Sequence, residues 1–421
     1  MKRADRKFME DGIRTLHTFN STPELKGNTR YIFTDADMQA RDYLKSLIKE
    51  AGLELYEDGI GNIFAVLRGE DSKLPPVWTG SHFDTVINGG MYDGVVGSLG
   101  AIEALKVIKD SGERHLRDIA AVLFTSEESG RFGIGCLGSH FITGEEGFES
   151  IEDTKRIKDD NGVTLYEAMT ERGYGKDFEK IRKKKGDIFA FIELHIEQGP
   201  VLESMGIPIG IVTGITAPTY ISVTIKGEQR HAGSTPMNAR KDSMCAFAEI
   251  VLELESYAKS LGHPNFCATV GKVNVSPNAS NVIAGEVRFT IDLRGIKSKP
   301  KDKMAEDIIR FFAYLKEKRG VKIEYHIDAN DKPMFSNENL VELIEGVCED
   351  KKLPYHKMNS GAYHDSLMMA KLCPMAMIFV PSKDGISHDP DEYTSMDEIM
   401  EGVDVLCESV LRIANRTEPL N

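Results

Sequence analysis

Residues 119–130 of this chain read IAAVLFTSEESG. The first six residues are apolar without a break, which is typical of a strand that is buried on both faces of a sheet. Similar apolar runs occupy residues 188–194 and 375–380, and another strand is expected to begin at 77–80. Helical spacing of apolar residues lies between these strands, at 34–52 and from Val95 to about Gly112. Strands that alternate with helices predict an α/β layered domain.

Residues 212–329 have a different pattern. Apolar and polar residues alternate in the strands expected here, which indicates a sheet with one packed face and one free face. The predicted order is strand, helix, strand, strand, helix, strand, at 221–225, 239–261, 268–275, 286–294, 301–318 and 322–327. This order is ferredoxin-like. We therefore predict an α+β domain at 212–329 that is inserted into an α/β catalytic domain made of residues 1–211 and 330–421.

The composition excludes several classes of partner. The chain has 421 residues, enough for two domains, and a net charge of −14 at pH 7. An acidic protein is a poor partner for nucleic acid, because phosphate binding needs clustered Lys and Arg. No apolar signal segment or run of 18 apolar residues is present, and the six cysteines form no Cys-x-x-Cys pair. We therefore expect a cytoplasmic protein that does not bind membranes.

The segment that follows the strand at 77–80 carries the first candidate ligands. It reads GSHFDTVINGGMYDG over residues 80–94, just past a strand end, where α/β sheets place their ligand sites. His82 and Asp84 alternate on an extended segment, so one can bind a metal ion while the other orients it. The glycines allow the backbone to return Asp93 to the same point. Taken alone, the segment is also compatible with an ordinary loop and a buried histidine.

Three further strand ends carry side chains of the same kind. Glu127 and Glu128 follow the strand at 119–124, and adjacent carboxylates are costly unless a cation neutralises them. A solvated acidic turn is the common alternative. His195 follows the apolar run at 188–194, and His388 follows the run at 375–380. Imidazole and carboxylate ligands without thiolates suit Zn²⁺, Mn²⁺ or Co²⁺, so the four strand ends together predict a metal site.

The inserted domain contains three candidates for substrate binding. His231 lies in a loop after its first strand, and Asn281 opens the strand that ends with Arg294. A guanidinium on the polar face of that strand can grip a carboxylate with two hydrogen bonds. For each residue alone, an ordinary surface role is the simpler interpretation.

Seven segments of the chain together resemble the metal-dependent amidohydrolases of the carboxypeptidase G and aminoacylase superfamily. They are GSHFDTV, GGMYDG, SEESGRFG, ELHIEQGPVLE, HAGSTPM, NASNVIAGEVRFTIDLR and GISHDP, and the match runs from about Arg30 to Pro390. Within the superfamily the chain looks like the branch of L-carbamoylases, allantoate amidohydrolases and β-ureidopropionases, which the segment ELHIEQGP defines. Related peptidases usually have a carboxylate where this chain has His195.

The resemblance implies a dinuclear site that holds two divalent ions, Zn²⁺, Mn²⁺ or Co²⁺. In the family pattern Asp93 bridges the two metals. His82 and His195 would complete one metal site, and Glu128 and His388 would complete the other.

The resemblance also implies the roles of the remaining candidates. Glu127 would be the general base, and His231 would help to stabilise the oxyanion. The substrate would be bound by His231, Gln198, Asn281 and Arg294. The family usually forms homodimers through the inserted domain, which we also expect to move as a lid.

The reaction implied by the resemblance is cleavage of the carbamoyl C–N bond of an N-carbamoyl-L-amino acid, a small molecule with a carboxylate. Allantoate and β-ureidopropionate are alternative substrates. Residues 217–220, Ala-Pro-Thr-Tyr, stand where basic residues are expected in allantoate enzymes. Tyr363 replaces the glycine usual in the family segment Ser-Gly-Ala-Gly-His-Asp. Both differences fall at positions that can reshape the pocket.

Three other functions fit parts of the sequence. An aminopeptidase or dipeptidase on the same scaffold is disfavoured by His195 and by the strand of Arg294. A two-metal phosphoesterase would need a basic cluster near the motifs, and the sequence has none there. A protein that only binds its ligand would not need Glu127 beside Glu128.

Overall fold

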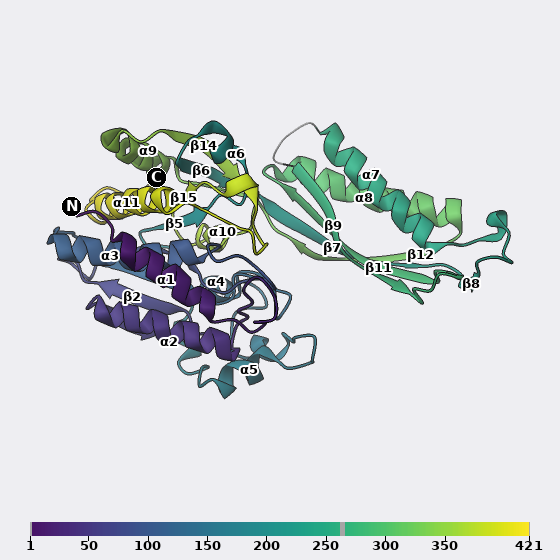
Figure 1. Ribbon diagram of the computed structural model, residues 1–421, viewed down its shortest axis with the longest axis horizontal. Coiled ribbons are helices and arrows are strands. Elements are labelled where there is room, and N and C mark those ends of the chain that lie inside the picture. Colours follow the sequence, from purple (N-terminus) through teal and green to yellow (C-terminus); the bar gives the residue numbers. More distant parts are fainter. Residues whose placement is uncertain (1, 262–265, 421) are drawn as a thin grey trace. The chain divides into compact units, whose positions relative to one another are not determined.

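The computed structural model describes residues 2–261 and 266–420 (Figure 1). Contacts between Cα atoms divide the chain into two compact units. The first unit lies within residues 1–213, 335–358 and 364–421, and the second comprises 214–334 and 359–363. None of the helices in the described ranges is long and apolar enough to cross a membrane.

The main sheet of the first unit is mixed. Its strands follow the order β1-β2-β4-β3-β5-β15-β6-β13, where β13 is Met334–Phe335, and β14 pairs with β6. The neighbours β4, β3, β5 and β15 run parallel to one another, whereas the flanking pairs β1-β2, β2-β4 and β15-β6 are antiparallel. The bounds are β1 (Glu54–Glu57), β2 (Ile63–Leu67), β3 (Val77–His82), β4 (Ile119–Phe124), β5 (Ala190–Ile196), β6 (Ile209–Ile215), β14 (Tyr355–Ser360) and β15 (Met375–Val380).

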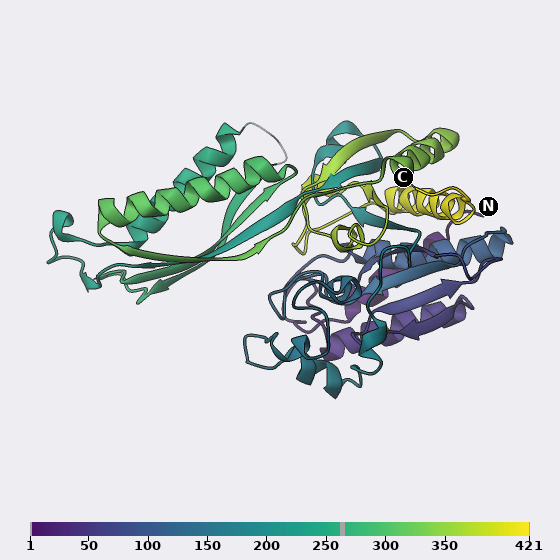
Figure 2. The same ribbon diagram turned by 180° about the vertical axis from the view of Figure 1, so that it is seen from behind.

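Helices cover both faces of the parallel strands (Figures 1 and 2). Helices α3 and α11 contact β5 on one face, and α10 contacts β5 on the other, next to α4. The bounds are α1 (Arg6–Thr18), α2 (Asp35–Glu50), α3 (Val95–Ser111), α4 (Leu137–Thr143), α5 (Leu165–Glu171), α6 (Val201–Met205), α9 (Glu338–Lys351), α10 (Asp365–Met369) and α11 (Met396–Ala414). This arrangement agrees with the predicted α/β layers.

Local sequence explains where these elements begin and end. All six residues of β4 are buried, as expected for an apolar run inside a parallel sheet. Thr34 caps α2, and its side chain accepts a hydrogen bond from the amide of Asp37. Ser395 and Glu398 form a capping box at the start of α11. The predicted helix at 34–52 is therefore observed with nearly the expected limits.

The second unit has the predicted ferredoxin-like order of elements. Its strands form a four-stranded antiparallel sheet in the order β12-β7-β11-β9. The bounds are β7 (Ala217–Lys226), α7 (Ser243–Ser260), β9 (Phe266–Ser276), β11 (Glu286–Gly295), α8 (Ser298–Arg319) and β12 (Lys322–Asn330). Helices α7 and α8 pack on one face around a core that includes Phe289 and Phe312.

Two details of the second unit differ from the sequence pattern. The helix expected from 239 begins at Ser243, because residues 237–239 form a 3₁₀ turn and Asp242 caps the helix. Residues 359–363 join this unit although the pattern did not assign them to it, and the amide of Thr216 donates to the carbonyl of Ser360 at 2.9 Å. The roles of this unit as lid and dimer surface stay predictions.

Candidate metal centre

The four parallel strands carry the predicted motifs at their carboxyl ends. His82 is the last residue of β3, and Glu127 lies three residues after β4. His195 lies near the end of β5, and His388 lies in the loop that follows β15. The registers of β3 with β4 and of β5 with β15 bring these ends level. The site therefore lies at the carboxyl edge of the sheet, where parallel α/β sheets place their ligands.

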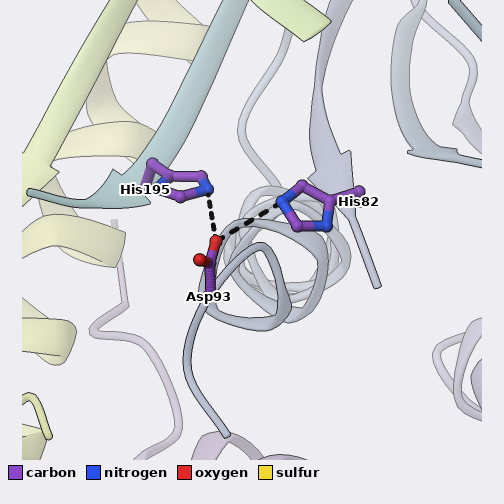
Figure 3. Close-up of side chains that lie close together, drawn as sticks. All are labelled: His82, Asp93 and His195. Atoms are coloured by element: carbon purple, nitrogen blue, oxygen red, sulfur yellow. Dashed lines mark ion pairs between the residues drawn. The ribbon is translucent and has the colours of Figure 1, made fainter. Parts of the chain in front are cut away.

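Asp93 lies at the centre of the cluster. Its Oδ1 atom is 3.2 Å from Nε2 of His195 and 3.5 Å from Nε2 of His82 (Figure 3). Its Oδ2 atom is 3.3 Å from Nε2 of His388, which in turn is 3.1 Å from Oε1 of Glu128. The five predicted ligands thus form two groups that share Asp93, and each group offers three ligand atoms within 4.8 Å of one another.

The contacts of His195 test whether these residues fit a metal ion. Its Nδ1 atom lies 2.9 Å from the carbonyl oxygen of Ile196, which can only accept, so Nδ1 carries the proton. In neutral His195 the Nε2 atom then has a free lone pair, and it faces Oδ1 of Asp93, which is also an acceptor. Both atoms are buried without a hydrogen-bond partner. Two such acceptors need a cation, and a divalent ion of the zinc, manganese or cobalt kind fits this donor set.

The electrostatics within the cluster also fit a bound cation. Burial would raise the pKa of Asp93, but the adjacent imidazoles of His195, His388 and His82, which are cations when protonated, hold it well below its usual range. Burial lowers the pKa of His388, but its bonds to Asp93 and Glu128 outweigh this effect and raise the pKa to about 11. The carboxylates of the metal-free centre are therefore balanced by protonated imidazoles, and a bound metal ion would replace those protons.

Asp84 contacts both the ring of His82 and the turn that carries the two glutamates. Its two carboxylate oxygens accept the amides of Glu127 and Glu128, at 3.0 and 3.1 Å. The Nδ1 atom of His82 is 3.2 Å from the backbone oxygen of Asp84 and 3.6 Å from its carboxylate. Asp84 therefore fixes the turn that separates the two adjacent glutamates, while His82 keeps Nε2 toward Asp93.

Glu127 is buried beside the ligand group that contains His82. Its Oε2 atom is 3.8 Å from Nε2 of His82, and its Oε1 atom accepts from the thiol of Cys136 at 3.5 Å. Burial raises the pKa of the Glu127 carboxyl well above its usual range, against the lowering effect of His82. A buried carboxylate with a raised pKa beside candidate metal ligands has the character of a general base.

Gln198 also lies at the centre. Its Nε2 atom donates to Oδ2 of Asp93 at 2.8 Å, and its Oε1 atom is buried without a hydrogen-bond partner. The backbone of Gln198 has φ 58°, a left-handed conformation that turns its side chain back from the end of β5.

His364 is a site residue that the motif analysis did not single out. It is buried, and its ring lies 4.6 Å from the ring of His195, edge to face. With Glu193 it forms a further group of possible ligand atoms around His195. Glu193 is occupied by the hydroxyls of Ser81 and Ser366, at 2.7 and 2.6 Å. The sequence offered one sign of His364, which is its position directly after Tyr363 in the segment that resembles the family pattern Ser-Gly-Ala-Gly-His-Asp.

Arg294 is held by partners within the second unit. Its Nε and Nη2 atoms donate to the carboxylate of Asp292 at 3.0 to 3.2 Å, and Nη2 donates to the hydroxyl of Tyr220 at 3.4 Å. Its Nη1 atom donates to the carbonyl of Gly361 at 3.2 Å. A substrate carboxylate would therefore have to share or replace Asp292.

His231 and Asn281 lie together at a small antiparallel two-stranded sheet made of β8 (Arg230–His231) and β10 (Val282–Ile283), which we call the β8–β10 sheet. The amide of Ala232 donates to the carbonyl of Asn281 at 2.9 Å. His231 is exposed, and its Nδ1 atom accepts the amides of Gly233 and Ser234 at 3.1 and 3.2 Å. Neutral His231 therefore carries its proton on Nε2, which is free to donate to an anion.

The second unit separates His231 from Arg294. Arg294 pairs with Pro218 at the beginning of β7, and eight residues later Lys226 pairs with Glu286. At about 3.3 Å per residue, roughly 26 Å of strand separates these two pairs. Strand β8 follows the far end of β7 (Figure 1). One small substrate cannot contact both His231 and Arg294 of the same chain.

Comparison with known proteins places the chain among amidohydrolases. Residues 76–412 match the model of peptidase family M20/M25/M40. A ureidoglycolate hydrolase from Oryza sativa subsp. japonica is 39% identical, covering 97% of this chain and 85% of its own. An N-carbamoyl-L-amino acid amidohydrolase from Geobacillus stearothermophilus is 36% identical, covering 92% and 94%. An allantoate amidohydrolase from Escherichia coli (strain K12) is 34% identical, covering 97% and 98%.

The comparison with solved structures agrees with the sequence comparison. The crystal structure of AtUAH in complex with glyoxylate has a TM-score of 0.90 and 38% identity to this chain, and the match covers 98% of both chains. The relatives confirm the family branch that the segment ELHIEQGP predicted, and they leave the exact substrate open. Because the family model spans most of the chain and the relatives exceed 30% identity over nearly all of it, this protein belongs to peptidase family M20/M25/M40, a family of metal-dependent hydrolases, and to its amidohydrolase branch.

Proposed function

We propose that this chain is a two-metal amidohydrolase that cleaves the ureido group of an α-ureido carboxylate. The observation that supports this most directly is the pair of ligand groups that share Asp93. N-carbamoyl amino acids, ureidoglycolate and allantoate all carry a ureido nitrogen on the carbon atom that bears the carboxylate. They differ in one substituent on that carbon, which is a side chain, a hydroxyl or a second ureido group.

In this proposal one ion is held by His82, Asp93 and His195, and the other by Asp93, Glu128 and His388. Metal ions in such a site supply two kinds of chemistry, polarisation of a carbonyl and acidification of water. The overall reaction consumes one water molecule and releases the amine, ammonia and carbon dioxide.

The chain's own residues move the proton and hold the substrate. Glu127 accepts a proton from the attacking water and then delivers it to the leaving nitrogen. The Nε2–H group of His231 donates to the developing oxyanion, which is typically a large stabilising term. Arg294 binds the substrate carboxylate, and Gln198 and Asn281 contribute amide groups.

We further propose that the active site is shared between two copies of the chain. The separation of roughly 26 Å along β7 keeps His231 and Arg294 of one chain from contacting the same substrate. In a homodimer, the β8–β10 sheet of one subunit can supply His231 and Asn281 to the metal centre of the other. This arrangement is isologous, so both sites are completed in the same way.

Among the α-ureido carboxylates we place ureidoglycolate first. The sequence alone favoured N-carbamoyl-L-amino acids, but the 39% identity to a ureidoglycolate hydrolase over 97% of the chain favours the hydroxyl compound. In this proposal Tyr363, which directly precedes His364, takes the space that a glycine would leave for a larger substituent. Its hydroxyl donates to Asp331 at 3.3 Å and can also serve as a partner for a substrate hydroxyl.

The test is a substrate panel on protein that has been stripped of metal and reloaded with Zn²⁺, Mn²⁺ or Co²⁺. Ammonia release is measured with ureidoglycolate, N-carbamoyl-L-amino acids, allantoate and N-carbamoyl-β-alanine, and the release of free amino acids is measured with a dipeptide, each against a control without enzyme. We expect no activity in the stripped protein and the highest kcat/KM with ureidoglycolate. Full activity without metal would refute the metal centre, and a preference for the dipeptide would refute the substrate class.

Two variants separate the size of Tyr363 from its hydroxyl group. Tyr363→Gly should raise kcat/KM for allantoate or carbamoyl amino acids relative to ureidoglycolate, because it opens space. Tyr363→Phe keeps the ring and should lower only the activity on ureidoglycolate. Unchanged preferences in both variants would show that Tyr363 does not select the substrate.

A further inference from the structure

Glu392 is a buried carboxylate that the proposed mechanism does not use. It lies between the loop of His388 and α11, and only 4% of it is exposed. Its Oε1 atom accepts the backbone amides of Tyr92 and Asp93, at 2.9 and 3.1 Å. The segment that leads into the bridging aspartate is therefore tied by its backbone to a residue 300 positions away in the chain.

The second oxygen of Glu392 reaches the side chain of the same aspartate through Ser387. The Ser387 hydroxyl lies 2.9 Å from Oε2 of Glu392 and 3.0 Å from Oδ2 of Asp93. A hydroxyl has one proton, so Ser387 donates to only one of these two carboxylate oxygens at a time, while its oxygen lies within hydrogen-bond distance of both. Glu392 thus contacts Asp93 in two ways. It accepts the backbone amide of Asp93 directly, and it reaches the carboxylate of Asp93 through Ser387.

Gly90 in the segment GGMYDG leaves the space that Glu392 fills. A Cβ atom at Gly90 would lie 2.2 to 2.5 Å from three atoms of Glu392, which are its three nearest neighbours. Gly90 is not among the residues with positive φ, so the glycine is not needed for backbone conformation. This corrects the sequence interpretation for Gly90, whose use is the absence of a side chain.

The loop around Asp93 needs such an anchor. Asp93 precedes α3 and is followed by Gly94, which has φ 67°. Glycines raise the conformational entropy of the unfolded and metal-free loop. Bridging two ions requires both oxygens of Asp93 at fixed positions, and groups that orient metal ligands typically contribute about 10- to 100-fold to metal affinity.

We propose that Glu392 is a positioning residue that fixes the backbone and the side chain of Asp93 for metal binding, and that Gly90 is glycine in order to admit it. This inference rests on the proposed function in so far as Asp93 is taken to bind metal. The anchoring itself is a property of the metal-free protein and can be measured there.

The experiment compares three substitutions at Glu392 with matched controls. Glu392→Ala removes both contacts, Glu392→Asp shortens them, and Glu392→Gln keeps an oxygen for the two amides. Asp153→Ala and Asp153→Asn are the controls, because Asp153 is also buried and accepts two backbone amides, from Glu149 and Ser150. All variants are first checked for the native fold by circular dichroism and thermal unfolding.

Hydrogen exchange of metal-free protein is the first readout. Peptides that cover residues 88–95 should exchange at least about 10-fold faster in Glu392→Ala and close to the wild-type rate in Glu392→Gln, because a lost hydrogen bond opens the local amides. The second readout is the affinity for Zn²⁺ or Mn²⁺ by calorimetry. We expect a loss of about 10- to 100-fold in Glu392→Ala, a smaller loss in Glu392→Gln and none in the Asp153 variants.

A double-mutant cycle tests the pairing with Gly90. Gly90→Ala should resemble Glu392→Ala in both readouts, because the added methyl displaces the carboxylate. In the background of Glu392→Ala the same methyl group should cost little, so the two effects should not add. Additive effects would refute the link between the two residues.

The outcomes separate this inference from the proposed function. Wild-type exchange and wild-type metal affinity in Glu392→Ala would overturn the anchoring role. Equal losses in the Gln and Ala variants would show that charge and not position matters. If wild-type protein binds no metal, the proposed function fails, and the exchange of residues 88–95 still decides the role of Glu392.

Discussion

Glu127 and Glu128 are adjacent in sequence but have separate surroundings. Glu128 lies 3.1 Å from His388, whereas Glu127 faces His82 and the thiol of Cys136. The amides of both glutamates are held by one carboxylate, that of Asp84. Because one carboxylate holds both amides, the turn keeps the side chains of Glu127 and Glu128 in their separate surroundings. Separate surroundings are what the two proposed roles, general base and metal ligand, require.

Substitution of Glu127 should separate catalysis from metal binding. Glu127→Gln keeps the shape of the side chain but removes the base, so kcat should fall by about 10²- to 10⁴-fold. Metal content, measured by elemental analysis, should stay at the wild-type value. Glu128→Gln is the matched control, and it should lose metal together with activity. Retained activity in Glu127→Gln would remove it from the role of general base.

Metal binding should release protons. In the metal-free protein the pKa of His388 is raised to about 11 by Asp93 and Glu128, which outweigh burial, and the pKa of His82 is also raised well above its usual value. These imidazoles are therefore protonated at neutral pH, and a metal ion must displace their protons. Apparent affinity should increase as the pH rises. Calorimetry in buffers of different ionisation enthalpy measures the release, and an affinity independent of pH would contradict this account.

At the scale of elements, α3 and the parallel strands together position the candidate metal ligands. Gly97 in the first turn of α3 has no space for a side chain. A Cβ atom there would lie 2.1 Å from the carbonyl oxygen of Leu194 and 2.6 Å from Cβ of Ser81. These two residues directly precede His195 and His82. The close approach of the helix therefore fixes the two strand ends that carry one predicted metal site.

Gly97→Ala should accordingly reduce both stability and metal content. Forcing a methyl group into a packed contact typically costs about 1–3 kcal/mol. The control is Gly346→Ala in α9, where a Cβ atom meets nothing within 4 Å. That change should be neutral or stabilise by roughly 0.5–1 kcal/mol, since alanine favours helix. Thermal unfolding and elemental analysis measure both effects, and equal behaviour of the two variants would contradict the packing argument.

The same elements show what could be predicted from sequence. The run at 119–124 and the alternation at 286–294 predicted buried and half-buried strands, because period and composition are local properties. Strand ends then predicted the places of His82, Glu128 and His195. Glu392 and the attachment of residues 359–363 could not be predicted. They depend on contacts between segments distant in the chain, for which one sequence carries no periodic signal.

At the scale of the whole molecule, the second unit presents its candidate residues at two ends. Arg294, near the end of β11, pairs with Pro218 at the beginning of β7, where the chain enters the unit from β6, and His231 follows the far end of β7. His231 is exposed, and its Nε2–H group is available to donate a hydrogen bond. A hydrogen-bond donor at the tip of an inserted unit has a catalytic use only if a metal centre meets it there. In the proposed shared site, a second copy of the chain would provide that centre with no new component.

Mixing two inactive variants tests the shared site. Glu127→Gln removes the base, and His231→Ala removes an oxyanion donor, a loss that typically costs about 10²- to 10³-fold. Each homodimer should therefore have little activity. In a heterodimer, one site combines Glu127 from the second variant with His231 from the first and is intact. The other site carries both defects. Activity should return to a sizeable fraction of the wild-type value after the variants are mixed and allowed to exchange subunits.

The control for this experiment is a pair whose defects lie in the same metal centre. Glu127→Gln mixed with Glu128→Gln should recover nothing, because both residues belong to the first unit of each chain, so one or the other defect remains in every site. Heterodimer formation is confirmed with two different affinity tags. If tagged heterodimers of the Glu127 and His231 variants form without regaining activity, each site uses its own His231. The roughly 26 Å of strand between His231 and Arg294 would then require that Arg294, and not His231, lies outside the active site.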